Sequence, residues 1–166
     1  MTAPALPLLA TSELVVAAWI ASIPGLSPQM VATTLPPDVT PEGKPAPWIQ
    51  TGFVTISVVG GSPDPYLPVK KPVLQVDAWA AVPGSNKPPW GMANVLIETI
   101  RYATLQRTGF NRLLTLTANG FAYPSAVVDS AYFLTEPRRD YADAADYAHY
   151  LCDMQVVWRT PGDVLP

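Results

Sequence analysis

The most regular alternation of apolar and polar residues in this chain lies near its C-terminal end, between Tyr147 and Arg159. A period of two is typical of a β-strand with one buried face, so the pattern predicts a strand over this range. A second β-rich run, Ala126–Thr135, precedes it, and we expect the two to pair. The predicted strand has an apolar face of Ala148, Tyr150, Cys152, Met154, Val156 and Trp158, and an opposite face with His149, Asp153, Gln155 and Arg159.

The segment between these two strands, Glu136–Asp146, is rich in charged residues. Pro137 ends the preceding strand, so we expect a long exposed loop that projects between the paired strands. In a ring of identical subunits, a segment with both signs of charge can contact the next subunit head to tail. The alternative is an ordinary surface loop with no partner. The charged side chains concerned are Arg138, Arg139, Asp140, Asp143 and Asp146.

Two stretches have the period and end signals of helices. The first is Leu14–Ser22, with Thr11 and Ser12 as N-caps and Ile23-Pro24-Gly25 as its end. The second is Trp90–Arg107, which follows two prolines and has its stop signal at Gly109. Its expected buried stripe is Ala93, Leu96, Ile97, Ile100 and Ala103 or Thr104.

The remaining β-type segments are joined without helical crossovers, which favours an antiparallel or mixed sheet. We therefore predict an α+β fold in a single domain, residues 1–166, with two helices packed on one face of the sheet and a long hairpin near the C-terminus. Two proline-rich loops, Pro36–Pro47 and Gly60–Lys71, separate strands. The expected strands are Met30–Leu35 (a weak candidate), Trp48–Val59, Val73–Val82 and Leu113–Thr117.

The chain has few charges for its size. Charged residues are 14% of its 166 residues and hydrophobic residues 49%, against about 25% charged in an average soluble protein. A surface this poor in charge suggests that partners cover part of it, although prolines and small polar residues could cover it instead. The net charge of −3 argues against a dedicated nucleic-acid binder.

The early apolar residues are interrupted by Pro4 and Pro7 and have no basic region before them, so we expect no secretory signal. The longest apolar run, Leu14–Ile23, is too short to cross a bilayer. We therefore expect a soluble protein that is intracellular when made. Cys152 is the single cysteine, and we expect it to be a small core residue.

Catalytic motifs are scarce. His149 and Cys152 would point to opposite faces of one strand, which excludes a dyad, and we expect His149 to be an exposed sheet residue. Gly60-Gly61 lacks the lysine and serine of a phosphate loop. The aspartates at 140, 143 and 146 lack the spacing and central glycine of a calcium loop, so a solvated acidic segment is the simpler interpretation. We predict no catalytic residue, no metal and no cofactor.

An alternative from another functional class is a small ligand-binding or hydrolytic domain. It would use Asp77, Asp129 and Asp153 on polar strand faces. These carboxylates would cluster if their strands were neighbours, but isolated aspartates on a sheet face are usually solvated or paired.

Trp90 stands at the start of the second helix. A core anchor is its simpler role, although an exposed tryptophan there would be a strong interface anchor. The full set of candidate subunit-interface residues is Arg138, Arg139, Asp140, Tyr141, Asp143, Asp146, Trp90 and Arg101.

Two stretches resemble the tail-terminator proteins of long-tailed phages, especially those of actinobacterial hosts. The first is Pro89-Trp90-Gly91-Met92-Ala93-Asn94 running into Glu98–Thr104, and the second is Ala148–Trp158. Chain length, element order and the charged connector agree with this resemblance, which extends over most of the chain from about Trp48. These motifs are structural and not catalytic.

The resemblance implies a non-enzymatic virion protein that is assembled in the host cytoplasm. Such a protein forms a homo-oligomeric ring, expected to be a hexamer, which caps the head-proximal end of the tail tube, stops tube polymerisation and joins the tail to the neck. The implied partners are the tail tube protein and a head-neck connector or stopper protein. Genome DNA would pass through the lumen without sequence-specific binding, and no membrane is involved. The nearest alternative is a head-tail stopper or connector of the neck.

Overall fold

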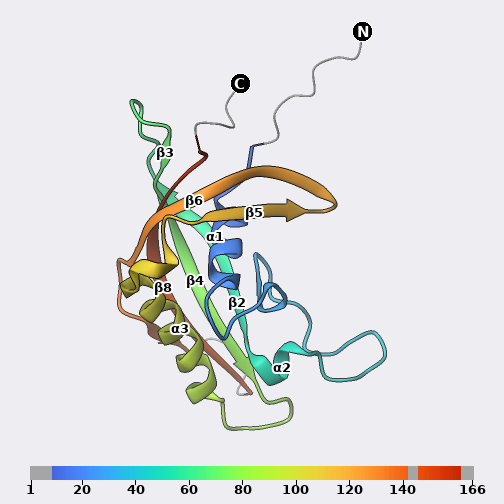
Figure 1. The fold of residues 1–166 in the computed structure, drawn as a ribbon. Coiled ribbons are helices and arrows are strands. Elements are labelled where there is room, and N and C mark those ends of the chain that lie inside the picture. Colours follow the sequence, from blue (N-terminus) through green and yellow to red (C-terminus); the bar gives the residue numbers. More distant parts are fainter. Residues whose placement is uncertain (1–8, 142–145, 162–166) are drawn as a thin grey trace.

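A computed structural model describes residues 9–141 and 146–161 of the chain. Figure 1 shows the arrangement of a curved sheet with helices against it. The helices are α1 (Ser12–Ala21), η1 (Pro28–Met30), α2 (Trp48–Thr51), α3 (Trp90–Leu105) and η2 (Arg107–Gly109). The strands are β1 (Val31–Ala32), β2 (Phe53–Gly61), β3 (Val69–Lys70), β4 (Pro72–Ala81), β5 (Leu113–Ala118), β6 (Phe121–Phe133), β7 (Arg138–Asp140) and β8 (Tyr147–Arg159).

The strands form one sheet with the order β1-β2-β4-β8-β6-β5, and β3 and β7 also pair with β8. The β1–β2 pair is parallel and the other pairs are antiparallel. The sheet is therefore mixed, and the α+β prediction is confirmed. β8 is the organising strand, because four other strands hydrogen-bond to it.

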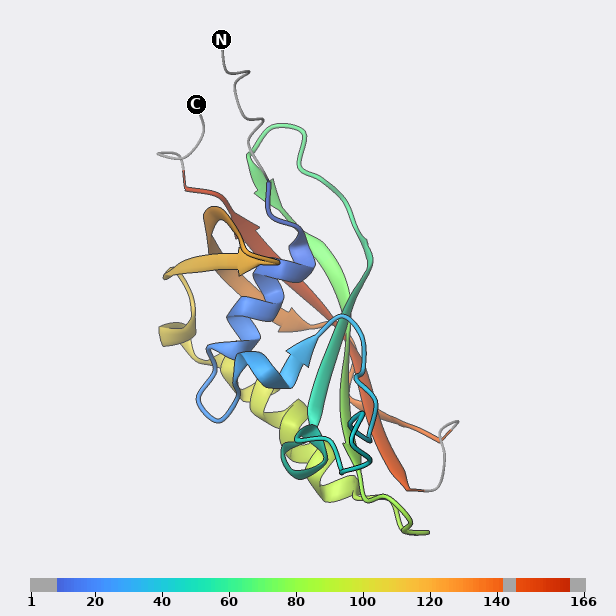
Figure 2. The same cartoon turned by 90° about the vertical axis from the view of Figure 1, so that its right-hand side faces the viewer.

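Both long helices pack on the same side of the sheet (Figure 2). The sheet contributes the inward side chains of β4 and β8, and α3 contributes the five apolar residues of its buried stripe. Two tryptophans fix the helix α1 within this core. Trp158 Nε1 donates to Ser12 Oγ at 3.1 Å, and Trp19 Nε1 donates to the Gly109 carbonyl at 3.0 Å.

The strongest sequence patterns are confirmed. The predicted strand Tyr147–Arg159 has the bounds of β8, and each of its six apolar-face residues is buried. Thr11 caps α1 as expected, because its Oγ1 accepts a hydrogen bond from Leu14 N at 3.2 Å. The predicted buried stripe of α3 is also correct.

Several predicted boundaries were wrong. Trp48–Thr51 is a short helix and not the start of a strand, because Pro47 already has helical dihedral angles and Gly52 ends the turn with φ +74°. α3 ends at Leu105, since Gln106 is extended, so Gly109 does not stop it. The weak candidate Met30–Leu35 contains only the two-residue strand β1.

Gly52 is required by its surroundings as well as by its backbone angle. A Cβ atom at this position would lie 2.4 Å from Leu96 Cδ1 and 3.0 Å from the Trp79 carbonyl oxygen. The glycine therefore lets α3 pack closely against the junction of α2 and β2.

Candidate functional site

The charged connector that follows β6 folds back onto the sheet. Arg138, Arg139 and Asp140 form β7, which pairs antiparallel with β8 opposite Leu151, Tyr150 and His149. The expectation that this whole segment projects as a loop is therefore wrong for these residues. The reason is that β6 covers only part of β8, and the rest of that edge has backbone groups that β7 satisfies.

On the helix side of β7, Arg139 lies among aromatic rings. Its Nε donates to the Tyr150 hydroxyl at 2.8 Å, and its guanidinium lies 4.9 Å from the Trp90 ring centroid. The Trp90 ring also contacts Tyr141, with 5.4 Å between centroids. The hydrogen bond to Tyr150 raises the pKa of Arg139 above its ordinary value. We call Trp90, Arg139, Tyr141 and Tyr150 the aromatic cluster.

A second contact joins the connector to α3. Arg101 makes two hydrogen bonds to the Glu136 carboxylate, at 2.7 and 3.1 Å, and lies 3.7 Å from Glu98. The Glu136 side chain is 78% exposed. Two-point arginine–carboxylate contacts fix orientation, but exposed pairs add little stability. Glu136 thus sets where the connector leaves β6.

The opposite face of the sheet contradicts one prediction. His149 is 6% exposed and is not a solvated sheet residue. Its Nε2 lies 2.8 Å from Asp77 Oδ1, and its Nδ1 lies 4.0 Å from Asp140 Oδ2 of β7. Its ring stacks on Trp79 at 3.7 Å between centroids. The wrong expectation came from treating a polar strand face as a solvent face.

Further hydrogen bonds extend this polar group across the sheet. Trp79 Nε1 donates to Thr55 Oγ1 at 2.9 Å, and Gln75 Nε2 donates to Asp77 at 2.9 Å. The contacts therefore join β2, β4, β8 and β7 on the face away from α1 and α3. Buried polar groups are stable when their hydrogen bonds are satisfied. We call Thr55, Gln75, Asp77, Trp79, Asp140 and His149 the polar cluster.

The structure brings some of the candidate interface residues together. Trp90, Arg101 and Arg139 lie on the helix side, whereas Asp140 lies on the other side with His149. The Asp146 carbonyl accepts a hydrogen bond from Val82 N. Asp143 lies outside the described residues. The sequence alone did not identify Tyr150 and Glu136 as partners of these residues, because both contacts depend on how the connector folds.

Where β7 lies beside the start of α3, the outward side chains are a guanidinium group and an aromatic ring. Arg138 is exposed, and Tyr141 is 72% exposed although its ring touches Trp90. A large aromatic ring and a guanidinium group are the residue types enriched at protein interfaces. The corner made by β7 and the start of α3 therefore exposes residue types that are common at interfaces.

Two of the three aspartates of the hydrolytic alternative are paired within the chain. Asp77 contacts His149, and Asp129 lies 3.2 Å from Arg159 Nε at the bulge of β6. Within residues 9–141 and 146–161, no three His, Cys, Asp or Glu side chains are arranged to hold a metal ion. Each of these two carboxylates thus has a structural partner within the chain.

Cys152 is buried in the core, as predicted. Burial is the main cause that raises the pKa of its thiol to about 12. In the described ranges, no helix has the length and apolar character needed to span a membrane.

Comparison with known proteins gave a distant structural likeness. No family model matches the chain, and no curated protein is similar to it. Among solved structures, the chain is similar to a chain from the virion of a native gene transfer agent particle. The identity is 13%, the TM-score is 0.45, and the match covers 84% of this chain and 83% of that chain. This likeness is too distant to indicate a function.

Proposed function

We propose that this protein is a structural component of a phage virion and, more specifically, a tail terminator. In this role, copies of the chain form a ring, expected to be a hexamer, at the head-proximal end of the tail tube. The ring stops tube polymerisation and joins the tail to the neck. The protein acts by contact and not by catalysis.

The observation that carries this proposal is the packing of the two stretches that resemble tail terminators. Pro89–Thr104 contains most of α3, and Ala148–Trp158 is most of β8. The two elements lie against each other, and the aromatic cluster joins their ends through Trp90 and Tyr150 at 5.8 Å. Residues that are distant in the sequence thus form one local unit, as expected if they share a common role.

The corner made by β7 and α3 is the proposed subunit contact. Arg138, Arg139 and Tyr141 are exposed there. Arg139 is also held by Tyr150, Tyr141 by the Trp90 ring, and Arg101 by Glu136. These contacts within the chain fix the shape of the corner, and the exposed Arg138 is available to a neighbour. A ring needs two different surfaces per subunit, so this corner would meet another part of the next copy.

Charge reversal at the exposed arginine tests the proposal. We expect Arg138→Glu to reduce ring formation and binding to purified tail tubes, measured by native mass spectrometry and by co-sedimentation. Arg107→Glu is the matched control, because Arg107 is an exposed arginine on η2, outside this corner. Both variants should melt within a few degrees of the wild type. Equal ring formation by both variants would exclude the β7 corner as the contact.

The location of the protein separates the tail terminator from its nearest alternative. A tail terminator remains with isolated tails after particles are disrupted, whereas a neck stopper or connector remains with filled heads. Immunoblotting of separated heads and tails distinguishes the two. A protein found in neither fraction would contradict a virion role altogether.

A further inference from the structure

The strand β5 leaves one edge of the sheet open in the part of the chain that the structure describes. β5 is the last strand in the sheet order and pairs only with β6. Leu114 pairs with Ala126, and Leu116 pairs with Tyr123. Between these two pairs the chain advances by two residues on β5 and by three on β6. The extra residue therefore belongs to β6, and β5 runs without a bulge.

This edge lacks the features that usually prevent strands from pairing with other chains. Leu113–Ala118 contains no charged residue and no proline. Soluble proteins commonly protect their edge strands with lysines, prolines, bulges or a covering segment. A regular, uncharged edge of six residues is therefore a pairing surface.

The helix beside this edge is also incompletely covered. α1 has a single charged residue, Glu13, and its apolar residues lie all around its axis. Helices that are apolar on every side are normally buried on every side. Here Leu14, Ala17, Ala18 and Ala21 are only half-buried.

The open edge and the apolar helix face border the same groove. Its volume is about 350 Å³, and the α1 residues just named line it together with Ser22 and with Thr115–Thr117 of β5, while Pro28 of η1 and Val31 of β1 form its other side. Figure 2 looks onto this region, where β5 crosses α1. No charged side chain lines the groove. A partner here must supply an extended backbone for β5 and apolar side chains for α1.

A second copy of this chain meets both requirements, the extended backbone through its own β5 and the apolar side chains through its own α1. The other open edges in the described residues match less well, since β1 has two residues and β7 has three. The outer half of β2 contains a bulge at Val59, because Val58 and Gly60 pair with the consecutive residues Leu74 and Val73 of β4. This half of β2 also ends in two glycines. The β5 strand is the edge with the required length and regularity.

We propose that two copies of this chain associate by antiparallel pairing of their β5 strands. A twofold axis between the two strands keeps Leu114 and Leu116 of both copies on the inner face and brings the alanine-rich faces of the two α1 helices toward each other. Small residues allow helices to approach closely. Thr115 and Thr117 lie on the outer face, where cross-strand threonine pairs are favourable. This contact is isologous, so it does not depend on the proposed head-to-tail ring.

Lysine substitution tests the contact. In Thr115→Lys/Thr117→Lys, four positive charges would face one another across the twofold axis, so we expect a loss of dimer in sedimentation equilibrium of the full chain. The Thr115→Glu/Thr117→Glu variant should also be monomeric at this edge. A mixture of the two variants should restore a dimer that contains one copy of each. Thr33→Lys/Thr34→Lys is the control at two exposed threonines outside the groove, and it should dimerise like the wild type.

Disulfide trapping gives an independent readout, even if larger assemblies form. Under mild oxidation, Thr115→Cys or Thr117→Cys should give a cross-linked band of two chains and no higher ladder. The buried Cys152 should not interfere, and Thr33→Cys serves as the exposed control. The proposal would be overturned by a monomeric wild type with no trapped dimer, or by unchanged association of the double-lysine variant. Failure of this contact would leave the Arg138 result unaffected, so the two proposals can be separated.

Discussion

The polar cluster on the outer face of the sheet makes the most quantitative prediction. Replacing His149 by alanine removes the imidazole that lies 2.8 Å from the buried Asp77 carboxylate. Asp77 would keep its hydrogen bonds from Gln75, but it is only 5% exposed. Leaving a buried polar group without one of its partners costs about 1–3 kcal/mol. The stacking of the imidazole on Trp79 is worth about 0.5–1.5 kcal/mol more.

We therefore expect His149→Ala to lower the free energy of unfolding by about 2–4 kcal/mol, which is a large part of the ~5–15 kcal/mol typical of a domain. The measurement is urea unfolding at neutral pH, with a thermal melt as a second readout. Each kcal/mol should lower the melting temperature by about 2–4 °C for a chain of this size.

A double-mutant cycle with Asp77→Asn isolates the pairwise contribution. If the two side chains interact as the geometry indicates, the cost of His149→Ala should fall by ~1 kcal/mol or more when position 77 is already neutral. Ser57→Ala is the control on the exposed part of β2 and should change stability by less than about 0.5 kcal/mol. A cost for His149→Ala no larger than that of the control would refute the burial of this group.

Three further predictions concern the core and the connector. Gly52→Ala should lower the free energy of unfolding, measured in urea, by about 2–4 kcal/mol, because it adds a clash with α3 to the backbone penalty. Gly43→Ala is the control with φ +75° and open space around it, and it should cost only about 1–2 kcal/mol. Equal costs would contradict the close approach of α3. Glu136→Gln should change stability by less than about 1 kcal/mol but should speed hydrogen exchange in β7, and unchanged exchange would show that the Arg101 contact does not hold the connector. The Cys152 thiol should be inert to a disulfide reagent at pH 8 in the folded protein and reactive in denaturant, because its pKa is raised to about 12; fast labelling of the folded protein would contradict its burial.

The raised pKa of Cys152 also has a consequence for stability at high pH. The folded state keeps this thiol protonated, whereas the unfolded thiol ionises above its ordinary value of 9.0. The unfolded state then binds fewer protons, so Cys152 should lower stability as the pH rises from about 9 toward 12. The measurement is the free energy of unfolding of the wild type and of Cys152→Ala between about pH 9 and pH 12. The variant should lose less stability over this range, and the difference is the contribution of Cys152.

Repeating patterns in the sequence were sufficient to predict the central elements. β8 alternates over its full length, and α3 has a clear apolar stripe, so both were predicted with their correct buried faces. The short elements were missed because they depend on single residues. The short helix Trp48–Thr51 forms because Pro47 and Gly52 fix its two ends. It was predicted as strand because the residues that follow it have a high propensity for β-structure.

The candidate site was only partly predictable. Charge and proline content correctly marked the connector as a distinct segment, but they could not indicate that an open part of β8 would pair with Arg138–Asp140. The burial of His149 was missed for a related reason. Its burial depends on neighbours from other strands, Trp79 and Asp77, and a strand pattern alone cannot identify cross-strand neighbours.

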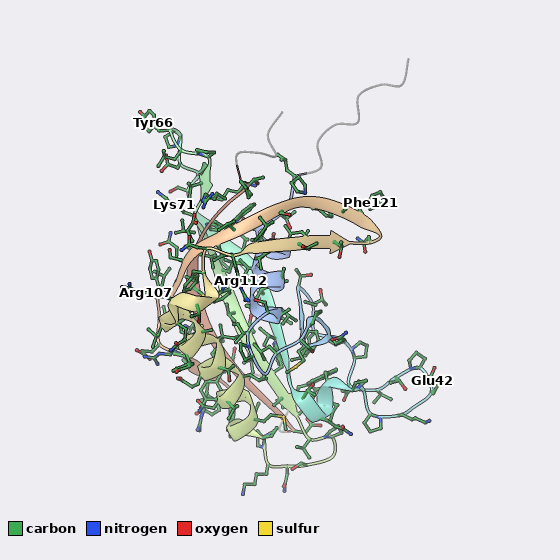
Figure 3. The ribbon with its side chains drawn as sticks, viewed as in Figure 1. Glu42, Tyr66, Lys71, Arg107, Arg112 and Phe121 are labelled. Carbon is green, nitrogen blue, oxygen red and sulfur yellow. The ribbon has the colours of Figure 1, made fainter. Side chains whose placement is uncertain are left out.

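The loops that project from the body, which include the tips near Glu42 and Tyr66 (Figure 3), were predicted as irregular from their prolines. The first keeps only an isolated bridge between Val39 and Pro45, while the second contains the two-residue strand β3. Tyr66 is 93% exposed at the tip of its loop.

The most direct test of the proposed role is imaging of the full-length protein mixed with purified tail tubes. The proposal predicts a ring of this chain at one end of each tube, and tubes that no longer lengthen when free tube protein is added. A protein that stays off the tube ends, while the tubes continue to grow at the same rate, would contradict it.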